Sequence, residues 1–294
     1  MVLLYVKIMN RMDILVTLDQ NYLPPLQVML TSLHLSHPRD SLRVYLMHRD
    51  IPKESLETLA AQCGQLGLEL VPIQVDGTLF QTAPITKQYP QEMYYRLLAP
   101  HLLPQDLHRV LYLDPDILVI NSLTPLWETE LQGCLFAAAS HKGKTELMNN
   151  LNQVRLGTEC KYFNSGVLLI DLDAGRKEIV PEIIFAYAEE HSKELLLPDQ
   201  DILNALYGHR TFELEDTFWN YDARYFNTYL LRSGGVCDLD WVLAHTAILH
   251  FCGKSKPWQP GYLRRFGILY KHYIQLTRRT GLYLEPTPVP AKAE

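Results

Sequence analysis

Residues 109–119 read Arg-Val-Leu-Tyr-Leu-Asp-Pro-Asp-Ile-Leu-Val. Two carboxylates, Asp114 and Asp116, interrupt a run that is otherwise apolar, and such a run is typical of a strand covered on both faces of a sheet. Residues i and i+2 of a strand point the same way, and Pro115 cannot donate to a sheet ladder. We therefore expect the strand to end here, with both carboxylates at its carboxyl end.

Two explanations fit this pair of aspartates. Paired oxygen ligands suit a Mg²⁺ or Mn²⁺ ion that holds a phosphate, and carboxylates between apolar segments need a cation or dense hydrogen bonding. Alternatively, the aspartates cap backbone N–H groups in the turn that ends the strand. The tripeptide alone leaves both explanations open, so the rest of the chain has to decide between them.

Strand-like and helix-like patterns alternate from residue 13 onward. Besides the strand that ends at Asp114, we expect strands over 13–18, 43–47, 68–75, 135–140 and 162–171, and helices from Pro24, over 53–66, over 94–103 and over 179–191. This alternation predicts an α/β fold with a Rossmann-like, mostly parallel sheet and helices on both faces. Ligands of such sheets bind at the carboxyl ends of strands, which is where Asp19 and the aspartate pair lie.

The composition is that of an ordinary globular protein. The chain has 294 residues and a formal net charge of −6, so it lacks the basic footprint of a general nucleic-acid binder. Its five cysteines contain no C-x-x-C pair, which favours reduced thiols in the cytosol over a disulfide framework. No apolar run reaches the length of a membrane span, and the first residues lack a signal-peptide core. We expect a cytoplasmic protein.

The C-terminal segment has a helical pattern of its own. Apolar residues recur at helical spacing from Phe266 to Ile274, and we expect an amphipathic helix over 261–281 that Gly281 ends, followed by a proline-containing tail over 282–294. Six basic residues recur in pairs on a neighbouring ridge: Arg264, Arg265, Lys271, His272, Arg278 and Arg279. Either the apolar face docks and these side chains are merely solvated, or they also make weak, salt-sensitive contact with an anionic membrane.

Two further polar clusters lie beside apolar segments. Asp19-Gln20-Asn21-Tyr22 follows the first strand, and either capping and turn chemistry or contacts to a nucleotide explain it, with Tyr22 stacking on a base. Asp199-Gln200-Asp201 precedes an apolar helical pattern and holds more acceptors than an N-cap needs. This second cluster is a candidate for gripping sugar hydroxyls while one side chain faces the reacting carbon.

His250 ends a strand-like segment, where a histidine is usually a hydrogen-bonded structural residue. Here Gly253 permits close approach to the backbone, and two lysines, of which one is Lys256, can neutralise a phosphate. A divalent ion bound by Asp114, Asp116 and His250, with diphosphate oxygens and Lys256 alongside, makes a coherent site. The mixed oxygen and nitrogen ligands favour Mn²⁺ over Mg²⁺.

Seven motifs occur in an order that resembles glycosyltransferase family 8. These are retaining sugar-nucleotide transferases that include bacterial lipooligosaccharide galactosyltransferases and proteins of the general-stress-protein-A type. The motifs are Leu18-Asp-Gln-Asn-Tyr22, Tyr95-Arg-Leu97, Leu111-Tyr-Leu-Asp-Pro-Asp116, Ser122-Leu-Thr-Pro-Leu-Trp127, Tyr162-Phe-Asn-Ser-Gly-Val-Leu-Leu-Ile170, Asp199-Gln-Asp-Ile-Leu-Asn204 and His250-Phe-Cys-Gly-Lys-Ser-Lys-Pro-Trp258.

The resemblance implies a GT-A fold over residues 12–260, with 1–11 as an N-terminal extension. It implies a UDP-hexose donor and a Mn²⁺ ion, with Mg²⁺ as the second choice. The implied metal ligands are Asp114, Asp116 and His250. Uridine would contact Asp19, Asn21 and Tyr22, and the diphosphate would contact Gly253 and Lys256. The donor sugar would contact Arg96, Asn164, Asp199 and Gln200.

The implied reaction is retaining α-transfer of galactose or glucose from the UDP-sugar to a glycan or lipid-linked saccharide. No strong nucleophile is evident, so we expect front-face attack by the acceptor. Gln200 would stabilise an oxocarbenium-like centre, and Asp199 would anchor sugar hydroxyls. The acceptor surface is expected in the irregular regions 141–160 and 216–240, which include Trp219-Asn220-Tyr221.

The chain departs from the family pattern at one place. Many relatives carry an acidic residue just after the strand that corresponds to 135–139, whereas residues 137–142 here read Ala-Ala-Ala-Ser-His-Lys. This gap supports the alternative of a catalytically weak, UDP-sugar-binding stress-response protein. A nucleotidyltransferase fits less well, because no glycine-rich phosphate loop opens the chain.

Overall fold

The computed structural model describes residues 11–80, 83, 85, 91–140 and 146–286. Within these residues, seven strands form the central sheet in the order β3-β2-β1-β4-β7-β6-β8. Their bounds are β1 (Met12–Thr17), β2 (Leu42–His48), β3 (Glu69–Gln74), β4 (Arg109–Leu113), β6 (Phe136–Ala139), β7 (Val167–Asp171) and β8 (Thr211–Leu214). β7 is antiparallel to β4 and β6, and the other neighbouring pairs are parallel, so the predicted mostly parallel sheet is confirmed.

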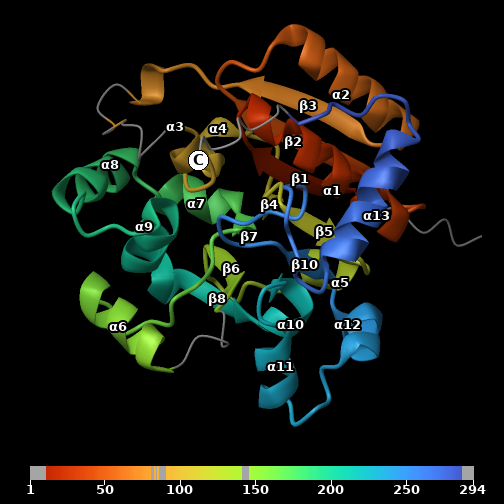
Figure 1. Ribbon diagram of the computed structural model, residues 1–294. Coiled ribbons are helices and arrows are strands. Elements are labelled where there is room, and N and C mark those ends of the chain that lie inside the picture. Colours follow the sequence, from red (N-terminus) through yellow and green to blue (C-terminus); the bar gives the residue numbers. More distant parts are fainter. Residues whose placement is uncertain (1–10, 81–82, 84, 86–90, 141–145, 287–294) are drawn as a thin grey trace, which may run out of the picture.

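Helices surround this sheet, as Figure 1 shows. They are α1 (Leu23–Ser36), α2 (Lys53–Gln65), α3 (Gln91–Tyr95), α4 (Ala99–Leu102), α5 (Thr124–Trp127), α6 (Glu146–Leu156), α7 (Leu172–Glu178), α8 (Pro181–Glu190), α9 (Pro198–Tyr207), α10 (Asp216–Trp219), α11 (Phe226–Arg232), α12 (Leu239–His245) and α13 (Gly267–Arg278). Short 3₁₀ helices span Gln20–Tyr22, Thr78–Phe80 and Gly208–Arg210.

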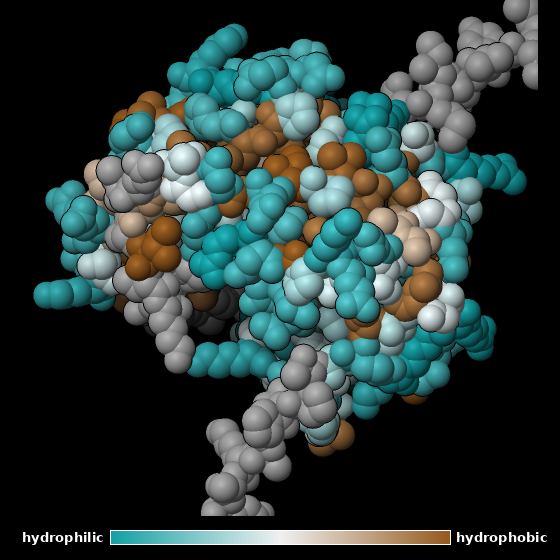
Figure 2. Space-filling view, turned by 90° about the horizontal axis from the view of Figure 1, so that it is seen from above, coloured by the Kyte–Doolittle hydropathy of each residue, from teal (hydrophilic) through white to brown (hydrophobic). Residues whose placement is uncertain are grey.

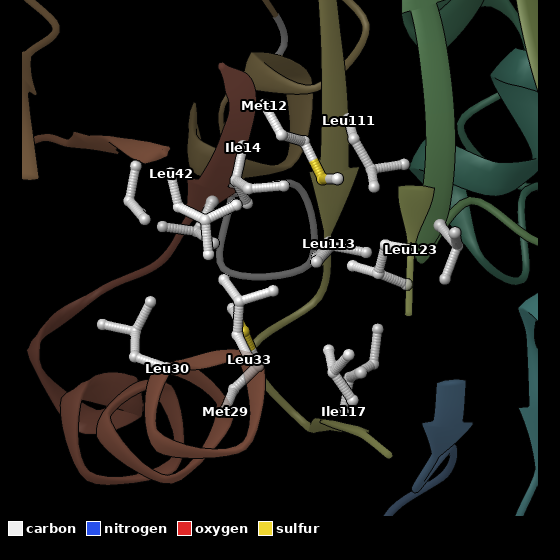
Figure 3. Packing of buried hydrophobic residues seen from close by; sticks show 14 of the residues in the cluster. Met12, Ile14, Met29, Leu30, Leu33, Leu42, Leu111, Leu113, Ile117 and Leu123 are labelled. Carbon is white, nitrogen blue, oxygen red and sulfur yellow. The ribbon is translucent and has the colours of Figure 1, made fainter. Parts of the chain in front are cut away.

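The alternation of side chains along β1 creates two cores. Ile14 and Val16 face one side, where they belong to the same buried cluster as the apolar residues of α1. Leu15 faces the other side, in a cluster that includes Tyr94 of α3 and Phe185 of α8. Figure 3 shows the first cluster, with side chains of α1 facing those of β1 and β4: Met12, Ile14, Met29, Leu30, Leu33, Leu111 and Leu113.

A smaller sheet continues from the aspartate pair. It contains β5 (Ile117–Val119), β9 (Tyr221–Asp222) and β10 (Ile248–His250), in the order β5-β10-β9. Residues 114–116 connect β4 of the large sheet to β5 of the small one, and the Phe251 N–H donates to the Asp116 carbonyl at 3.0 Å. The predicted end of the strand at Asp114 is therefore the junction of two sheets.

Two predicted elements are wrong in their extent. The helix expected over 94–103 is two short helices, because Pro100 lacks an N–H and its ring would clash with the carbonyl of Arg96 in a continuous helix. The strand expected over 162–171 begins only at Val167. Before it, Asn164 Oδ1 accepts the N–H of Gly166 at 3.0 Å, which makes a turn of this segment instead of a sheet ladder.

The C-terminal segment docks on α1 with its apolar face. Phe266, Tyr270 and Ile274 are buried in one cluster with Val28 of α1, and Figure 1 shows α13 along the edge of the fold. The helix is shorter than expected, since α13 begins at Gly267 and ends at Arg278, although Gly281 has the positive φ of 73° typical of a helix stop.

The residues that follow α13 are tied to α1 as well. Gln27 is fully buried, and its side chain donates to the Leu282 carbonyl at 2.8 Å and accepts the Leu284 N–H at 2.7 Å. Figure 2 shows hydrophilic side chains over much of one face, with apolar residues in smaller groups between them. Among the described residues, no helix combines the length and the apolar character needed to cross a membrane.

Candidate active site

A cavity of about 550 Å³ opens at the carboxyl ends of β1 and β4. The strand order reverses between these two strands, and open α/β sheets bind their ligands at such a point. Asn21 lies beside Asp19, to which it donates its backbone N–H at 2.8 Å, and it does not line the cavity. The other eleven residues assigned to the site from sequence all line it: Asp19, Tyr22, Arg96, Asp114, Asp116, Asn164, Asp199, Gln200, His250, Gly253 and Lys256.

Three candidate metal ligands meet in this cavity. Asp114 follows β4, Asp116 precedes β5, and His250 ends β10, and their ligand atoms all lie within 4.8 Å of one another. His250 Nε2 is 3.3 Å from Asp116 Oδ1 and 3.6 Å from Asp114 Oδ2. Two carboxylates and one imidazole fit a divalent ion such as Mn²⁺ or Mg²⁺.

Gly166 makes room for these ligands. A Cβ at this position would collide with the His250 ring and lie 2.5 Å from Asp114 Oδ2. The Gly166 carbonyl also accepts the backbone N–H of Asp114 at 2.8 Å. The segment before β7 therefore fixes Asp114 directly, and a side chain at residue 166 is incompatible with this arrangement.

The charges in the cluster favour the ionised form of Asp116. Burial alone raises the pKa of Asp116, but the neighbouring His250 ring and the Lys256 ammonium outweigh it and hold the pKa below its usual value. Burial lowers the pKa of His250, but Cys252 and Asp116 outweigh it, so the pKa lies well above its usual value. Positive charge is thus favoured at the place where the two carboxylates converge, as a cation-binding site requires.

A chain of hydrogen bonds connects His250 to Gln200. His250 Nδ1 lies 2.8 Å from Asn220 Oδ1, and Asn220 Nδ2 donates to Asn164 Oδ1 at 2.8 Å. Asn164 Nδ2 in turn donates to Gln200 Oε1 at 2.9 Å. The Gly166 N–H can only donate, so the Asn164 atom that faces it must be the oxygen, which sets the orientation of both asparagines. His250 therefore carries a proton on Nδ1 and directs Nε2 at the carboxylates.

Arg96 joins the metal cluster to the first turn of α9. The break between α3 and α4 places it between two carboxylates, with Nη1 3.1 Å from Asp114 Oδ1 and 3.0 Å from Asp199 Oδ2. Its guanidinium lies 4.5 Å above the ring of Tyr112. Burial alone would lower the pKa of Arg96, but Asp114 and the other neighbours outweigh it and raise the pKa, so the guanidinium stays charged.

The structure separates the three polar residues at the start of α9, because successive helical residues point in different directions. Asp199 and Gln200 line the cavity, and the Ser165 hydroxyl donates to Asp199 Oδ2 at 2.9 Å. Asp201 is fully buried and does not line the cavity; the two Arg155 N–H groups that it accepts lie 2.8 and 2.9 Å from its oxygens. Its predicted place in a sugar-binding cluster is therefore wrong.

Aromatic and cationic side chains meet at the mouth of the cavity. Tyr22 is 37% exposed, and its ring lies edge-on to Trp258 with the ring centroids 6.1 Å apart. Lys256 lies between this aromatic pair and the metal cluster, with its ammonium in contact with Asp116 Oδ2 and donating to the Phe251 carbonyl at 3.0 Å. The mouth of the cavity therefore offers aromatic rings to a planar base and a cation to an anionic group next to that base.

The role of Asn220 was not predicted from the sequence. We expected Asn220 and Tyr221 on the acceptor surface, but both are fully buried, Asn220 behind His250 and Tyr221 stacked on Tyr229. The cavity is also lined by residues outside the predicted site, such as Tyr162 and Arg224. No local pattern signals these residues, since tertiary contacts alone bring them here. Residues 141–142, which belong to the segment without the expected carboxylate, lie outside the described residues.

A solved structure defines the class of protein to which this fold belongs. The crystal structure of the galactosyltransferase LgtC in complex with donor and acceptor sugar analogs is similar to this chain with a TM-score of 0.75 and 26% sequence identity. The similarity covers 90% of this chain and 96% of that one. The chain therefore has the GT-A fold of a glycosyltransferase, with an Asp-x-Asp pair at the ends of its strands.

The sequence comparison identifies the family. The family model described as glycosyl transferase family 8 matches residues 13–260, and the chain belongs to that family. General stress protein A of Bacillus subtilis is 28% identical over 91% of this chain and 94% of its own length. Lipopolysaccharide 1,2-glucosyltransferase of Escherichia coli K12 is 28% identical over 82% of this chain and 70% of its own length.

Proposed function

We propose that this glycosyltransferase moves galactose or glucose from a UDP-sugar to a saccharide acceptor with retention of configuration. The observation that carries the proposal is the cluster of Asp114, Asp116 and His250 in a cavity that also holds Lys256 and Gln200. Family membership and relatives that are lipopolysaccharide glucosyl- and galactosyltransferases support the hexose donor. The acceptor we propose is a glycan or a lipid-linked saccharide.

The leaving UDP needs its negative charge neutralised. We assign Asp114, Asp116 and His250 as ligands of Mn²⁺, with Mg²⁺ as the second choice. When bound, the ion supplies electrostatic stabilisation of the departing diphosphate. Lys256 supplies a further positive charge, and the positive φ of 87° at Gly253 keeps the adjacent backbone free of a side chain. Asp19, Asn21 and Tyr22 are assigned to the uridine at the mouth of the cavity.

The donor sugar is assigned to the opposite wall of the cavity. Arg96 and Asn164 hold Asp199 and Gln200 in fixed orientations, as their hydrogen bonds indicate. Asp199 accepts hydrogen bonds from sugar hydroxyls, and Gln200 places a neutral amide dipole next to the reacting carbon. A neutral amide is a poor nucleophile, so the acceptor attacks from the face that the diphosphate leaves, and Gln200 stabilises positive charge that develops in the transition state.

Turnover of UDP-galactose and UDP-glucose with Mn²⁺ and a glycan extract tests this proposal. We expect Asp116→Asn to abolish turnover and weaken Mn²⁺–UDP binding strongly, because the substitution removes an anionic oxygen at nearly constant volume. Asp173→Asn, on the exposed surface of α7, is the matched control and should retain activity. Donor binding without turnover in the parent protein would instead favour the catalytically weak UDP-sugar-binding protein. Unchanged Mn²⁺ affinity in Asp116→Asn would remove this residue from the metal site.

We also propose weak contact of α13 with anionic membrane, which would place a cytoplasmic enzyme at the membrane surface. Lys271 and His272 of α13 and Arg279, which directly follows it, are exposed, whereas Arg278 pairs with Glu285 at 2.8 Å. Cations near an anionic lipid surface contribute about 1 kcal/mol each. Co-sedimentation with anionic vesicles at low and high salt tests this contact, and no binding at low salt would contradict it.

A further inference from the structure

A second hollow, of about 250 Å³, lies beside the active site. It is formed where the turn between β9 and α11 meets the segment that precedes α13, and arginines from both segments line it: Arg224, Arg264 and Arg265. We propose that this hollow binds the acidic group, a carboxylate or a phosphate, of a saccharide acceptor. The proposal rests on the glycosyltransferase function proposed above and names the class of acceptor.

Arg224 makes the hollow continuous with the donor cavity, because it lines both. Its guanidinium is fixed by the fully buried Asp222, with Arg224 Nη2 2.6 Å from Asp222 Oδ2. The charge of Arg224 is therefore neutralised, and the residue acts as a rigid wall between the two spaces. A ligand that occupies the hollow lies next to the donor site, where an acceptor has to be.

Arg264 and Arg265 carry the positive charge of the hollow. Within the ranges that the structure describes, neither arginine forms an ion pair, although both are exposed. They are nevertheless held in place, since the Arg265 guanidinium lies 4.2 Å above the ring of Phe226 and Arg264 Nη1 donates to the Arg224 carbonyl at 3.3 Å. Such ordering lowers the conformational entropy that a binding anion would otherwise remove.

The chemistry of the hollow matches an acidic sugar. Guanidinium groups bind carboxylates and phosphates through paired hydrogen bonds, and no carboxylate of the described part of the chain pairs with Arg264 or Arg265. Asn227 and Thr228 line the same hollow and offer hydrogen-bonding groups to sugar hydroxyls. This site is concave and shares Arg224 with the donor cavity, which favours a saccharide over a flat lipid surface.

The donor cavity has a mixed lining with more carboxylates than cations. Five carboxylates line it, from Asp19, Glu92, Asp114, Asp116 and Asp199, beside the cationic side chains of Arg96, Arg224 and Lys256. With UDP in the donor cavity, its diphosphate adds negative charge there, so an acidic group on the acceptor is repelled from this cavity and attracted to the neighbouring hollow. This charge difference orients the acceptor, with its acidic end at Arg264 and Arg265 and its neutral hydroxyl end toward the donor sugar.

Binding of matched glycans to the full chain tests the proposal. The probes are lactose, 3′-sialyllactose with a carboxylate, and lactose 6′-phosphate, titrated by ligand-observed NMR with Mn²⁺ replaced by Mg²⁺ and with excess UDP to occupy the donor cavity. We expect at least one acidic glycan to bind about tenfold more tightly than lactose, which is the difference that one charged hydrogen-bonded pair provides. Because binding is measured, a protein without transferase activity still gives a valid result.

Two double variants make the test specific. Arg264→Gln with Arg265→Gln should remove the preference for the acidic glycan, whereas Lys271→Gln with Arg279→Gln removes two charges outside the hollow and should keep it. Equal binding of neutral and acidic glycans by the parent protein would overturn the proposal, as would a preference that survives in the first variant. Loss of binding only to phosphatidylglycerol vesicles in that variant would assign these arginines to a membrane instead, and would also overturn it.

Discussion

His250 donates its Nδ1–H to Asn220 Oδ1 over 2.8 Å, and this bond leaves Nε2 facing the two aspartates. Partners of this kind orient a metal-bound histidine, and their loss lowers metal affinity by about 10- to 100-fold. We therefore expect Asn220→Ala to weaken Mn²⁺ binding in the presence of UDP by a factor in that range. Electron paramagnetic resonance of free Mn²⁺ measures this affinity. A Mn²⁺ affinity of Asn220→Ala equal to that of the parent protein would contradict the role of Asn220.

The raised pKa of His250 predicts how metal binding depends on pH. The ion-free ring holds a proton on Nε2 at neutral pH, and a metal can bind only after this proton leaves. Mn²⁺ affinity should therefore rise with pH until the medium passes the pKa of His250, and it should level off above that pH. Asp116, whose pKa is lowered, stays ionised throughout this range and adds no slope. Titration calorimetry in two buffers of different ionisation enthalpy should detect proton release, and its absence would contradict this account.

Gln200 is predicted to act in the transition state more than in donor binding. Its Oε1 is held by Asn164, so the amide is ordered before the donor arrives. We expect Gln200→Ala to lower kcat by about 10²-fold, as loss of an electrostatic contact to the reacting centre does, with little change in donor KM. Steady-state kinetics separates the two parameters. A raised KM with an unchanged kcat would assign Gln200 to ground-state binding only.

Asp201 is predicted to stabilise the fold and not to touch the substrate. It is buried against Arg155, so Asp201→Asn should lower the free energy of unfolding by about 3 kcal/mol near neutral pH. Burial raises the pKa of Asp201, but Arg155 and Tyr162 outweigh it, so the pKa in the folded state lies below its usual value. A carboxylate whose pKa is lower in the folded state than in the unfolded state stabilises the folded state at pH values above the unfolded-state pKa. This contribution disappears as the pH falls through the folded-state pKa. The difference between Asp201→Asn and the parent should therefore shrink below about pH 4.

Urea unfolding at several pH values measures this difference. Asp173→Asn again serves as the control, because its carboxylate is half exposed and pairs with the exposed His108. Exposed substitutions of this kind change stability by less than about 0.5 kcal/mol. A constant deficit of Asp201→Asn down to strongly acidic pH would show that the charge of Asp201 is not the source of the stabilisation.

The central features of the fold and site were accessible from local sequence patterns. Asp114 and Asp116 stand out because apolar residues flank them, and the alternation of strands and helices predicts where the carboxyl end of β4 lies. His250 and Lys256 stand at the end of another apolar segment. The residues next to them in the sequence indicate their role, so they can be found without knowledge of tertiary contacts.

Other parts depend on contacts between distant segments. Asn220 is buried because His250 and Asn164 meet it from other elements, and nothing in its own neighbourhood indicates this. Asp201 was placed in the candidate sugar-binding cluster because it adjoins Gln200, but the rotation of the helix turns it toward Arg155. The interruption of the helix expected over 94–103 is different, because its cause, Pro100, is a local feature of the sequence.

The bonds between Gln27 and residues 282 and 284 bear on how the chain folds as it is synthesised. Helix α1 leaves the ribosome early, yet the polar groups of its buried Gln27 side chain find these partners only in the last part of the chain. A buried amide without partners costs about 1–3 kcal/mol. Until residue 284 has emerged, the Gln27 amide of nascent α1 must therefore hydrogen-bond to water. The face of α1 on which α13 packs remains exposed to solvent during this time. A nascent chain stalled before that residue should be more sensitive to protease than the released protein.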